Sequence, residues 1–209
     1  MSHADRRDDH GDYNYDELYA NSGDNSPPWE IGQPQPALAA MINQNVIGHR
    51  VVDVGCGTGD LAIYLASHGY QATALDMSQV AIDQARRKAE KQGVTISFHV
   101  ADATRLETLS ETFDAAFDSG LLHSLDVDEQ TEYVDGLRHI CDRGASVYVL
   151  AVSLDAGLGW GVTEAHLQDV FGDPGWSSTT IVPAEVMAKM DGNTFPLDGF
   201  LLSTRWMPA

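Results

Sequence analysis

Residues 51–60 read Val-Val-Asp-Val-Gly-Cys-Gly-Thr-Gly-Asp, a short apolar run followed by three glycines spaced two apart. The valines favour a buried parallel strand. The glycines allow a sharp turn and let the backbone approach a ligand closely, where a Cβ would obstruct it. Helix-forming residues follow at once, over 61–67. This order of strand, glycine turn and helix predicts a nucleotide-binding α/β unit.

The glycine spacing distinguishes two classes of nucleotide. Dinucleotide-binding folds use G-x-G-x-x-G, and their helix N-terminus receives a pyrophosphate. Here the sixth position is Asp60, and Asp53 precedes the turn. Because both carboxylates would repel a pyrophosphate, an NAD-dependent oxidoreductase is disfavoured. S-adenosylmethionine (SAM) has no phosphate and carries a sulfonium and an α-ammonium, which such acids suit.

Three later apolar runs each end in an acid. Asp76 follows the glycines by about twenty residues, where doubly wound folds place the acid that binds ribose hydroxyls, although it could instead cap the next helix. Asp102 and Asp118 end the next two runs, and Asp102 could be a simple loop acid. Carboxyl ends of parallel strands meet at one edge of a sheet, so the three acids are expected in one site.

The whole pattern predicts one α/β domain with a Rossmann-like, doubly wound sheet that is mostly parallel. Strands and helices alternate over 50–153 with short connections, and no linker suggests a second domain. The expected strands are 51–54, 71–75, 95–100, 113–118, 145–153, 178–182 and 199–206, and the expected helices are 61–67, 78–91, 128–142 and 163–170.

Composition restricts the partners. The chain has 209 residues with 31 acids and 12 bases, a net charge of −19, which repels phosphate backbones and argues against nucleic acid. No apolar stretch approaches a membrane span, and the first residues are too polar for a signal peptide, so a cytoplasmic protein is expected. Cys56 and Cys141 form neither a disulfide framework nor a metal-ligand spacing, so no metal is expected.

The N-terminal part differs from the rest. Residues 1–28 are acidic and polar, and we expect a flexible segment there, a possible lid on a domain of residues 29–209. Tyr13, Tyr15, Leu18 and Tyr19 have spacings compatible with a short helix, which would either cover the site or anchor the segment to the core.

A stiff segment follows, Pro28-Trp29-Glu30-Ile31-Gly32-Gln33-Pro34-Gln35-Pro36. With the glycine turn at 51–59, residues 118–124 (Asp-Ser-Gly-Leu-Leu-His-Ser) and 199–203 (Gly-Phe-Leu-Leu-Ser), it resembles the class I SAM-dependent methyltransferases. The fit is to the thiopurine methyltransferase-like branch, which includes thiol and halide methyltransferases and the mycobacterial heterocyclic toxin methyltransferases; the last group is the most similar. The resemblance implies the class I fold, with an antiparallel C-terminal strand, and SAM as cofactor.

The resemblance also implies roles for single residues. Trp29 would lie against the methionine portion of SAM unless it only packs into the core, and the Asp102 carboxylate and a neighbouring amide would meet the adenine. The expected cofactor-binding residues are Trp29, Asp53, Gly55, Gly57, Gly59, Asp76, Met77, Asp102, Ala103 and Asp118.

The expected reaction is methyl transfer to an O, N or S atom of a small, planar aromatic or heterocyclic acceptor, which needs mainly alignment. His123, just after the fourth strand, is the candidate base for acceptors that must lose a proton, or it only positions the acceptor. Trp160, Trp176 and Phe195 would either line a flat acceptor pocket or belong to the core. The alternatives are a thiol or halide methyltransferase and a non-catalytic SAM-binding protein, as monomer or homodimer.

Overall fold

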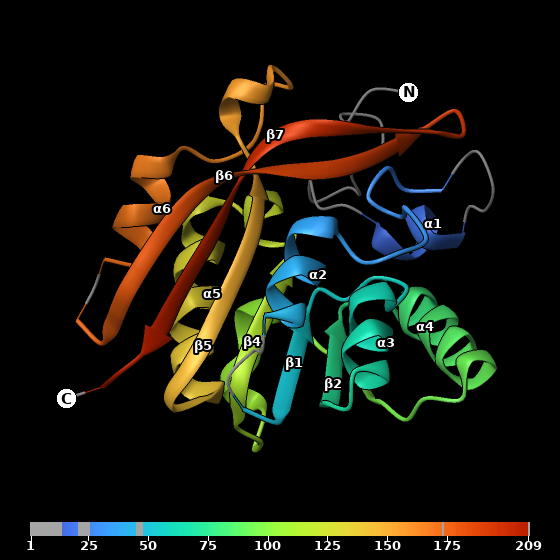
Figure 1. The fold of residues 1–209 in the computed structure, drawn as a ribbon, viewed down its shortest axis with the longest axis horizontal. Coiled ribbons are helices and arrows are strands. Elements are labelled where there is room, and N and C mark those ends of the chain that lie inside the picture. Colours follow the sequence, from blue (N-terminus) through green and yellow to red (C-terminus); the bar gives the residue numbers. More distant parts are fainter. Residues whose placement is uncertain (1–13, 21–25, 45–47, 173, 209) are drawn as a thin grey trace.

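The computed structural model describes residues 14–20, 26–44, 48–172 and 174–208, which form one sheet with helices on both faces (Figure 1). The sheet has the strand order β3-β2-β1-β4-β5-β7-β6. Its strands are β1 (Arg50–Val54), β2 (Gln71–Asp76), β3 (Ser97–Val100), β4 (Phe113–Ser119), β5 (Cys141–Val152), β6 (Trp176–Met190) and β7 (Asn193–Trp206).

The helices alternate with the strands along the chain. No helix in the described ranges combines the length and the apolarity that a membrane span needs. The α-helices are α1 (Tyr15–Ala20), α2 (Pro36–Asn43), α3 (Asp60–Ser67), α4 (Gln79–Gln92), α5 (Val127–Ile140) and α6 (Glu164–Val170), with 3₁₀ turns η3 (Ala103–Thr108), η4 (Leu122–Ser124) and η5 (Leu154–Ala156).

Strand directions confirm the fold class. The pairs within β1 to β5 are all parallel, as crossover helices require. β7 pairs antiparallel with β5 and with β6, so β6 runs in the direction of the first five strands. The sheet is therefore mostly parallel with an antiparallel C-terminal strand, as the sequence predicts.

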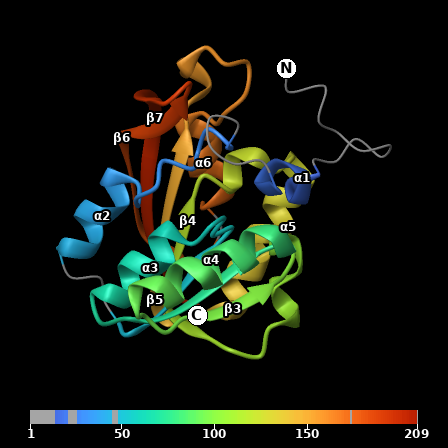
Figure 2. The ribbon, with the colours of Figure 1, turned by 90° about the vertical axis from the view of Figure 1, so that its right-hand side faces the viewer.

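Each face of the sheet has its own apolar core. Leu38 of α2 and Leu61 and Leu65 of α3 pack on one face, and Leu137 of α5 and Leu167 of α6 pack on the other (Figure 2). Between the two cores, β1 and β4 are buried along most of their length, as expected for parallel strands that are covered on both faces.

Several elements differ from the sequence prediction, among them β3, β5 and β7, which begin at Ser97, Cys141 and Asn193. The helix expected to reach Asp142 ends at Ile140, because Cys141 pairs with Phe113 and begins β5. The helix α2 was not predicted, since its proline-rich start reads as a turn, yet Pro36 stands in the first turn, where a missing N–H costs nothing. β6 is far longer than residues 178–182 because β7 pairs with it as far as Met190.

The β6–β7 hairpin projects beyond the carboxyl end of β5. The last pair of β5 with β7 is Val152 with Gly199, whereas β6 and β7 stay paired to Met190 and Asn193 (Figure 1). The projecting part is joined to the segment before α2, because the Gln35 side chain donates to the Met187 carbonyl at 2.9 Å and accepts from its N–H at 2.8 Å.

The close packing of α4 on the glycine turn yields a stability prediction. A Cβ on Gly59 would lie 2.9 Å from the Ala85 Cβ, whereas one on Gly69 would meet nothing within 4 Å, and both glycines have a positive φ, +84° and +87°. Gly59→Ala should therefore lower the free energy of unfolding by about 1–3 kcal/mol more than Gly69→Ala. Urea denaturation of both variants measures this difference, and equal losses would refute the packing role.

Candidate functional site

The glycine turn is fixed by one carboxylate from the neighbouring strand. Asp76, at the end of β2, accepts hydrogen bonds from the Gly57 N–H at 2.8 Å and from the Ser78 N–H at 2.9 Å. Burial raises the pKa of Asp76 to about 6, and these two bonds oppose that shift. The acid predicted to bind ribose thus also holds the turn. Each carboxylate oxygen can accept more than one hydrogen bond, so Asp76 can still accept from a ribose hydroxyl.

The three glycines of the turn serve different purposes. All have positive φ, at 70°, 53° and 84° along the chain. A Cβ on Gly55 would lie 2.9 Å from the Leu121 Cβ, so this glycine makes room for the segment after β4. A Cβ on Gly57 would lie 2.8 Å from the Tyr19 hydroxyl and 2.9 Å from Glu30 Oε1. The front of the chain therefore reaches the centre of the turn.

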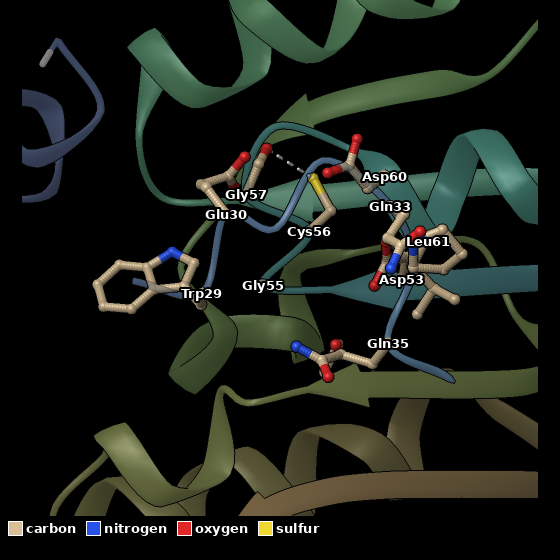
Figure 3. A pocket seen from close by; sticks show the side chains of 12 residues that line it. Trp29, Glu30, Gln33, Gln35, Asp53, Gly55, Cys56, Gly57, Asp60 and Leu61 are labelled. Carbon is tan, nitrogen blue, oxygen red and sulfur yellow. Dashed lines mark hydrogen bonds between the residues drawn. The ribbon is translucent and has the colours of Figure 1, made fainter. Parts of the chain in front are cut away.

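A small hollow lies between the turn and the segment of Trp29. Figure 3 shows the Trp29 indole on one side and Asp53, Gln33 and Leu61 on the other. Its volume is about 50 Å³. Within the described ranges, the predicted residues that line it are Trp29, Asp53, Gly55 and Gly57, joined by Glu30, Gln33, Pro34, Gln35, Cys56, Asp60, Leu61 and Ser119.

Asp53 is the most unusual group in the hollow. It is fully buried, and neither carboxylate oxygen has a hydrogen-bond partner in the described structure. Burial raises its pKa to about 8; the N–H of Ala62, outside hydrogen-bonding geometry, opposes this, and the charges of Asp118 and Asp76 add to it. An unpartnered buried carboxyl group needs a partner, and the cationic centres of SAM would supply one. The donor set therefore fits SAM.

Glu30 is a site residue that sequence reasoning missed. Its carboxylate accepts from the Thr58 N–H at 3.2 Å and from the Thr58 hydroxyl. Lys88 of α4 lies 3.8 Å from Glu30 and 2.6 Å from Asp60. Burial raises the pKa of Glu30, against the effect of Thr58 and Lys88. The Pro-Trp-Glu stretch is the only mark of Glu30 in the sequence, and it does not show that Glu30 contacts the glycine turn in the folded chain.

The adenine-side predictions lie at the next two strand ends. Met77 follows Asp76 and is exposed, and Asp102 and Ala103 follow β3. Asp102 Oδ1 caps η3, accepting from the Thr104 N–H at 2.9 Å and from its hydroxyl at 2.8 Å. These three residues do not contribute to the hollow in the described structure, so their cofactor roles stay predictions.

Asp118 has contacts of a different kind. It is fully buried, and its two oxygens accept from the N–H groups of Leu121 at 2.7 Å and of Leu122 at 3.0 Å. Burial raises its pKa to about 7, and these bonds oppose the shift. Its visible role is to shape the turn that carries His123, and direct contact with a cofactor remains a prediction.

His123 is held in one tautomer. Its Nδ1 accepts from the Val152 N–H at 3.2 Å, and its ring stacks on Trp160 with centroids 5.2 Å apart and planes at 21°. Burial lowers its pKa to about 4, so the ring is neutral near pH 7. Since Nδ1 accepts, the proton of the neutral ring is on Nε2. His123 can therefore donate a hydrogen bond to an acceptor, but neither nitrogen is placed to remove a proton.

The three aromatic residues predicted for the acceptor pocket or the core lie in different parts of the structure. Trp160 stacks on His123, and Phe195 lies on the projecting part of the β6–β7 hairpin. For Trp176 the core alternative is correct, because this side chain is buried between Phe171 and Trp206 at the other end of β6. Its apolar ring stabilises the core there.

Known proteins are similar to this chain in sequence and in fold. Residues 51–144 match the family model described as a methyltransferase domain. A protein of Mycobacteroides abscessus named 2-heptyl-1-hydroxyquinolin-4(1H)-one methyltransferase is 34% identical over 172 residues, which cover 79% of this chain and 75% of that protein.

Solved structures with a similar fold include two that bear on the family. The structure reported as "Conversion of a Disulfide Bond into a Thioacetal Group during Echinomycin Biosynthesis" is 31% identical, with a TM-score of 0.84 over 92% of this chain and 91% of that one. Magnesium protoporphyrin IX methyltransferase from Synechocystis PCC 6803 with bound SAM has a TM-score of 0.60 at 21% identity, over 81% and 76% of the two chains, and shows the shared fold.

The raised pKa of Asp53 predicts a pH-dependent stability. Between its ordinary pKa of 3.8 and the folded value of about 8, the folded protein holds a proton that the unfolded chain releases. The Asp53 carboxyl group therefore lowers the stability of the wild type as pH rises through this window, and Asp53→Asn lacks this contribution. Urea unfolding should show the variant gaining at least about 1 kcal/mol relative to wild type from pH 5 to pH 8. A constant difference between the two proteins would contradict this assignment.

Proposed function

This chain belongs to the class I SAM-dependent methyltransferases, and on that premise we propose that it methylates an O, N or S atom of a small aromatic or heterocyclic molecule. We further propose that it lies in the thiopurine methyltransferase-like branch, with the heterocyclic toxin methyltransferases. Two similarities support the acceptor class. The relative from Mycobacteroides abscessus is named for an N-hydroxylated quinolone, and the echinomycin structure concerns a change at sulfur.

When bound at this site, SAM would supply an electrophilic methyl group to the acceptor. The chain's own residues bind and align. Asp53, which would release its proton when the cation binds, and Glu30 would offer negative charge to the cationic centres, and Asp76 would accept from the ribose hydroxyls. The turn glycines let the backbone come close to the cofactor.

The observation that carries the acceptor assignment is the His123–Trp160 pair. The segment that carries His123 meets the glycine turn, because Leu121, two residues earlier, packs against Gly55. A neutral ring with its N–H on Nε2 would donate to an acceptor that is already an anion, such as an aromatic or N-hydroxyl oxygen or a heteroaryl thiolate. Such an acceptor ionises near neutrality and needs no base, so we assign His123 to positioning.

This assignment predicts the response of two kinds of acceptor. His123→Ala should lower kcat/KM about 10-fold or more, by a similar factor for acceptors of low and of high pKa, because a hydrogen bond to charge is lost in both. His123→Gln keeps an N–H donor and should recover part of the rate. In the wild type, kcat/KM should fall as the pKa of the acceptor rises above the assay pH, because less of the acceptor is ionised. A loss confined to high-pKa acceptors would instead identify His123 as a general base.

We also propose that residues 1–28 act as a lid. Residues 1–13 and 21–25 of this segment lie outside the described residues. The described part, α1, covers the glycine turn. The Tyr19 hydroxyl lies over Gly57 and accepts from Trp29 Nε1 at 2.9 Å. A hollow of about 50 Å³ is far below the roughly 300 Å³ typical of small-molecule sites, so the site must widen when SAM enters. Because α1 lies over the turn, we propose that its movement widens the site.

Asp16 offers a test of the lid. Its Oδ1 accepts from the Ser78 hydroxyl at 2.5 Å and from the Val80 N–H at 3.1 Å, which joins α1 to the N-terminus of α4. Asp16→Ala should weaken SAM binding about 5-fold or more in calorimetry while the unfolding midpoint changes little. Asp83→Ala, which removes an exposed pair with Arg86 on the same α4, is the control. Unchanged SAM affinity in Asp16→Ala would exclude the lid.

A further inference from the structure

The loop that leaves the carboxyl end of β5 has an unusual surface. Residues 153–162 read Ser-Leu-Asp-Ala-Gly-Leu-Gly-Trp-Gly-Val, with one charged side chain, Asp155, in a chain of net charge −19. Two leucines are exposed on it, Leu154 by 44% and Leu158 by 42%. Single exposed leucines are ordinary, but two on one short loop leave apolar area that a ligand can cover.

The base of this loop is closed. The Leu154 N–H donates to the Val162 carbonyl at 2.9 Å, and the Val162 N–H donates to the Val152 carbonyl at 2.9 Å. A Cβ on Gly161 would lie 2.8 Å from the Ser153 carbonyl, so the two ends of the loop pack directly on each other. The loop is therefore fixed to the sheet at both ends, which holds its exposed leucines at a defined place.

The loop also contacts the proposed acceptor site. Its Trp160 stacks on His123, and Trp160 and Ala156 pack into the same apolar cluster as Ala184 and Leu197 of the β6–β7 hairpin. Figure 1 shows the loop above the carboxyl end of β5, next to β7. An acceptor held by His123 would thus have its remaining atoms beside this loop and hairpin.

We propose that loop 153–162 determines acceptor specificity, with Leu154 and Leu158 binding an apolar substituent of the acceptor such as a straight alkyl chain. The inference rests on the proposed function, since it needs a reactive group held near His123. An alkyl chain loses water-exposed apolar area against the two leucines, whereas a polar substituent gains nothing from them. Leucine side chains on a surface otherwise rich in carboxylates favour an uncharged chain.

The test uses two acceptors with the same reactive group, 1-hydroxyquinolin-4(1H)-one without a substituent and the same ring with a hexyl chain at carbon 2. Leu154→Ser and Leu158→Ser should each raise KM for the hexyl acceptor about 5-fold or more, with kcat nearly unchanged. KM for the unsubstituted acceptor should change less than about 2-fold. Met207→Ser is the control, because Met207 is also 42% exposed but lies past the far end of β7.

The outcomes separate this inference from the proposed function. Equal changes of KM for both acceptors, or no change for either, would overturn the role of the loop. Turnover of the unsubstituted ring by the wild type would still support the proposed function. If the wild type methylates neither acceptor, both proposals fail for this acceptor class.

Discussion

The structure depends on the carboxylate of Asp76. It accepts from the backbone of the glycine turn after β1 and from the backbone at the start of α4, so it joins two α/β units at the point where both open toward the cofactor side. The bonds are made by a buried group, and a buried carboxylate left without them would be costly. Asp76 therefore fixes the turn, fixes the start of α4 and is the residue predicted to bind the ribose.

A second constraint is the concentration of negative charge around that turn. Burial raises the pKa of Asp53, Asp76 and Asp118, and the charges of Asp118 and Asp76 add to the rise at Asp53. Lys88 compensates only the outer acids, Asp60 and Glu30. A protein gains no stability from such an arrangement, and a cationic ligand relieves it. Acidity that repels pyrophosphate and favours a sulfonium is thus built into the fold.

Sequence patterns predicted the parts of the molecule that depend on local order. The strand, glycine turn and helix at 51–67 were predicted because apolar runs and glycines act within a few residues. The approach of Glu30 and Tyr19 to Gly57 was not, because it joins segments that only the folded chain brings together. Asp118 illustrates the limit: its position at a strand end suggested a ligand, and its visible partners are backbone N–H groups.

The most direct measurement is calorimetric titration of SAM into the wild type and Asp76→Ala. The account predicts micromolar-scale binding to the wild type, about −8 kcal/mol. SAM affinity should fall about 10-fold or more in the variant, because the substitution removes the hydrogen bonds that hold the turn and the predicted partner of the ribose. Circular dichroism would establish that the variant stays folded. Equal SAM affinity in the two folded proteins would contradict the claim that Asp76 organises the cofactor site.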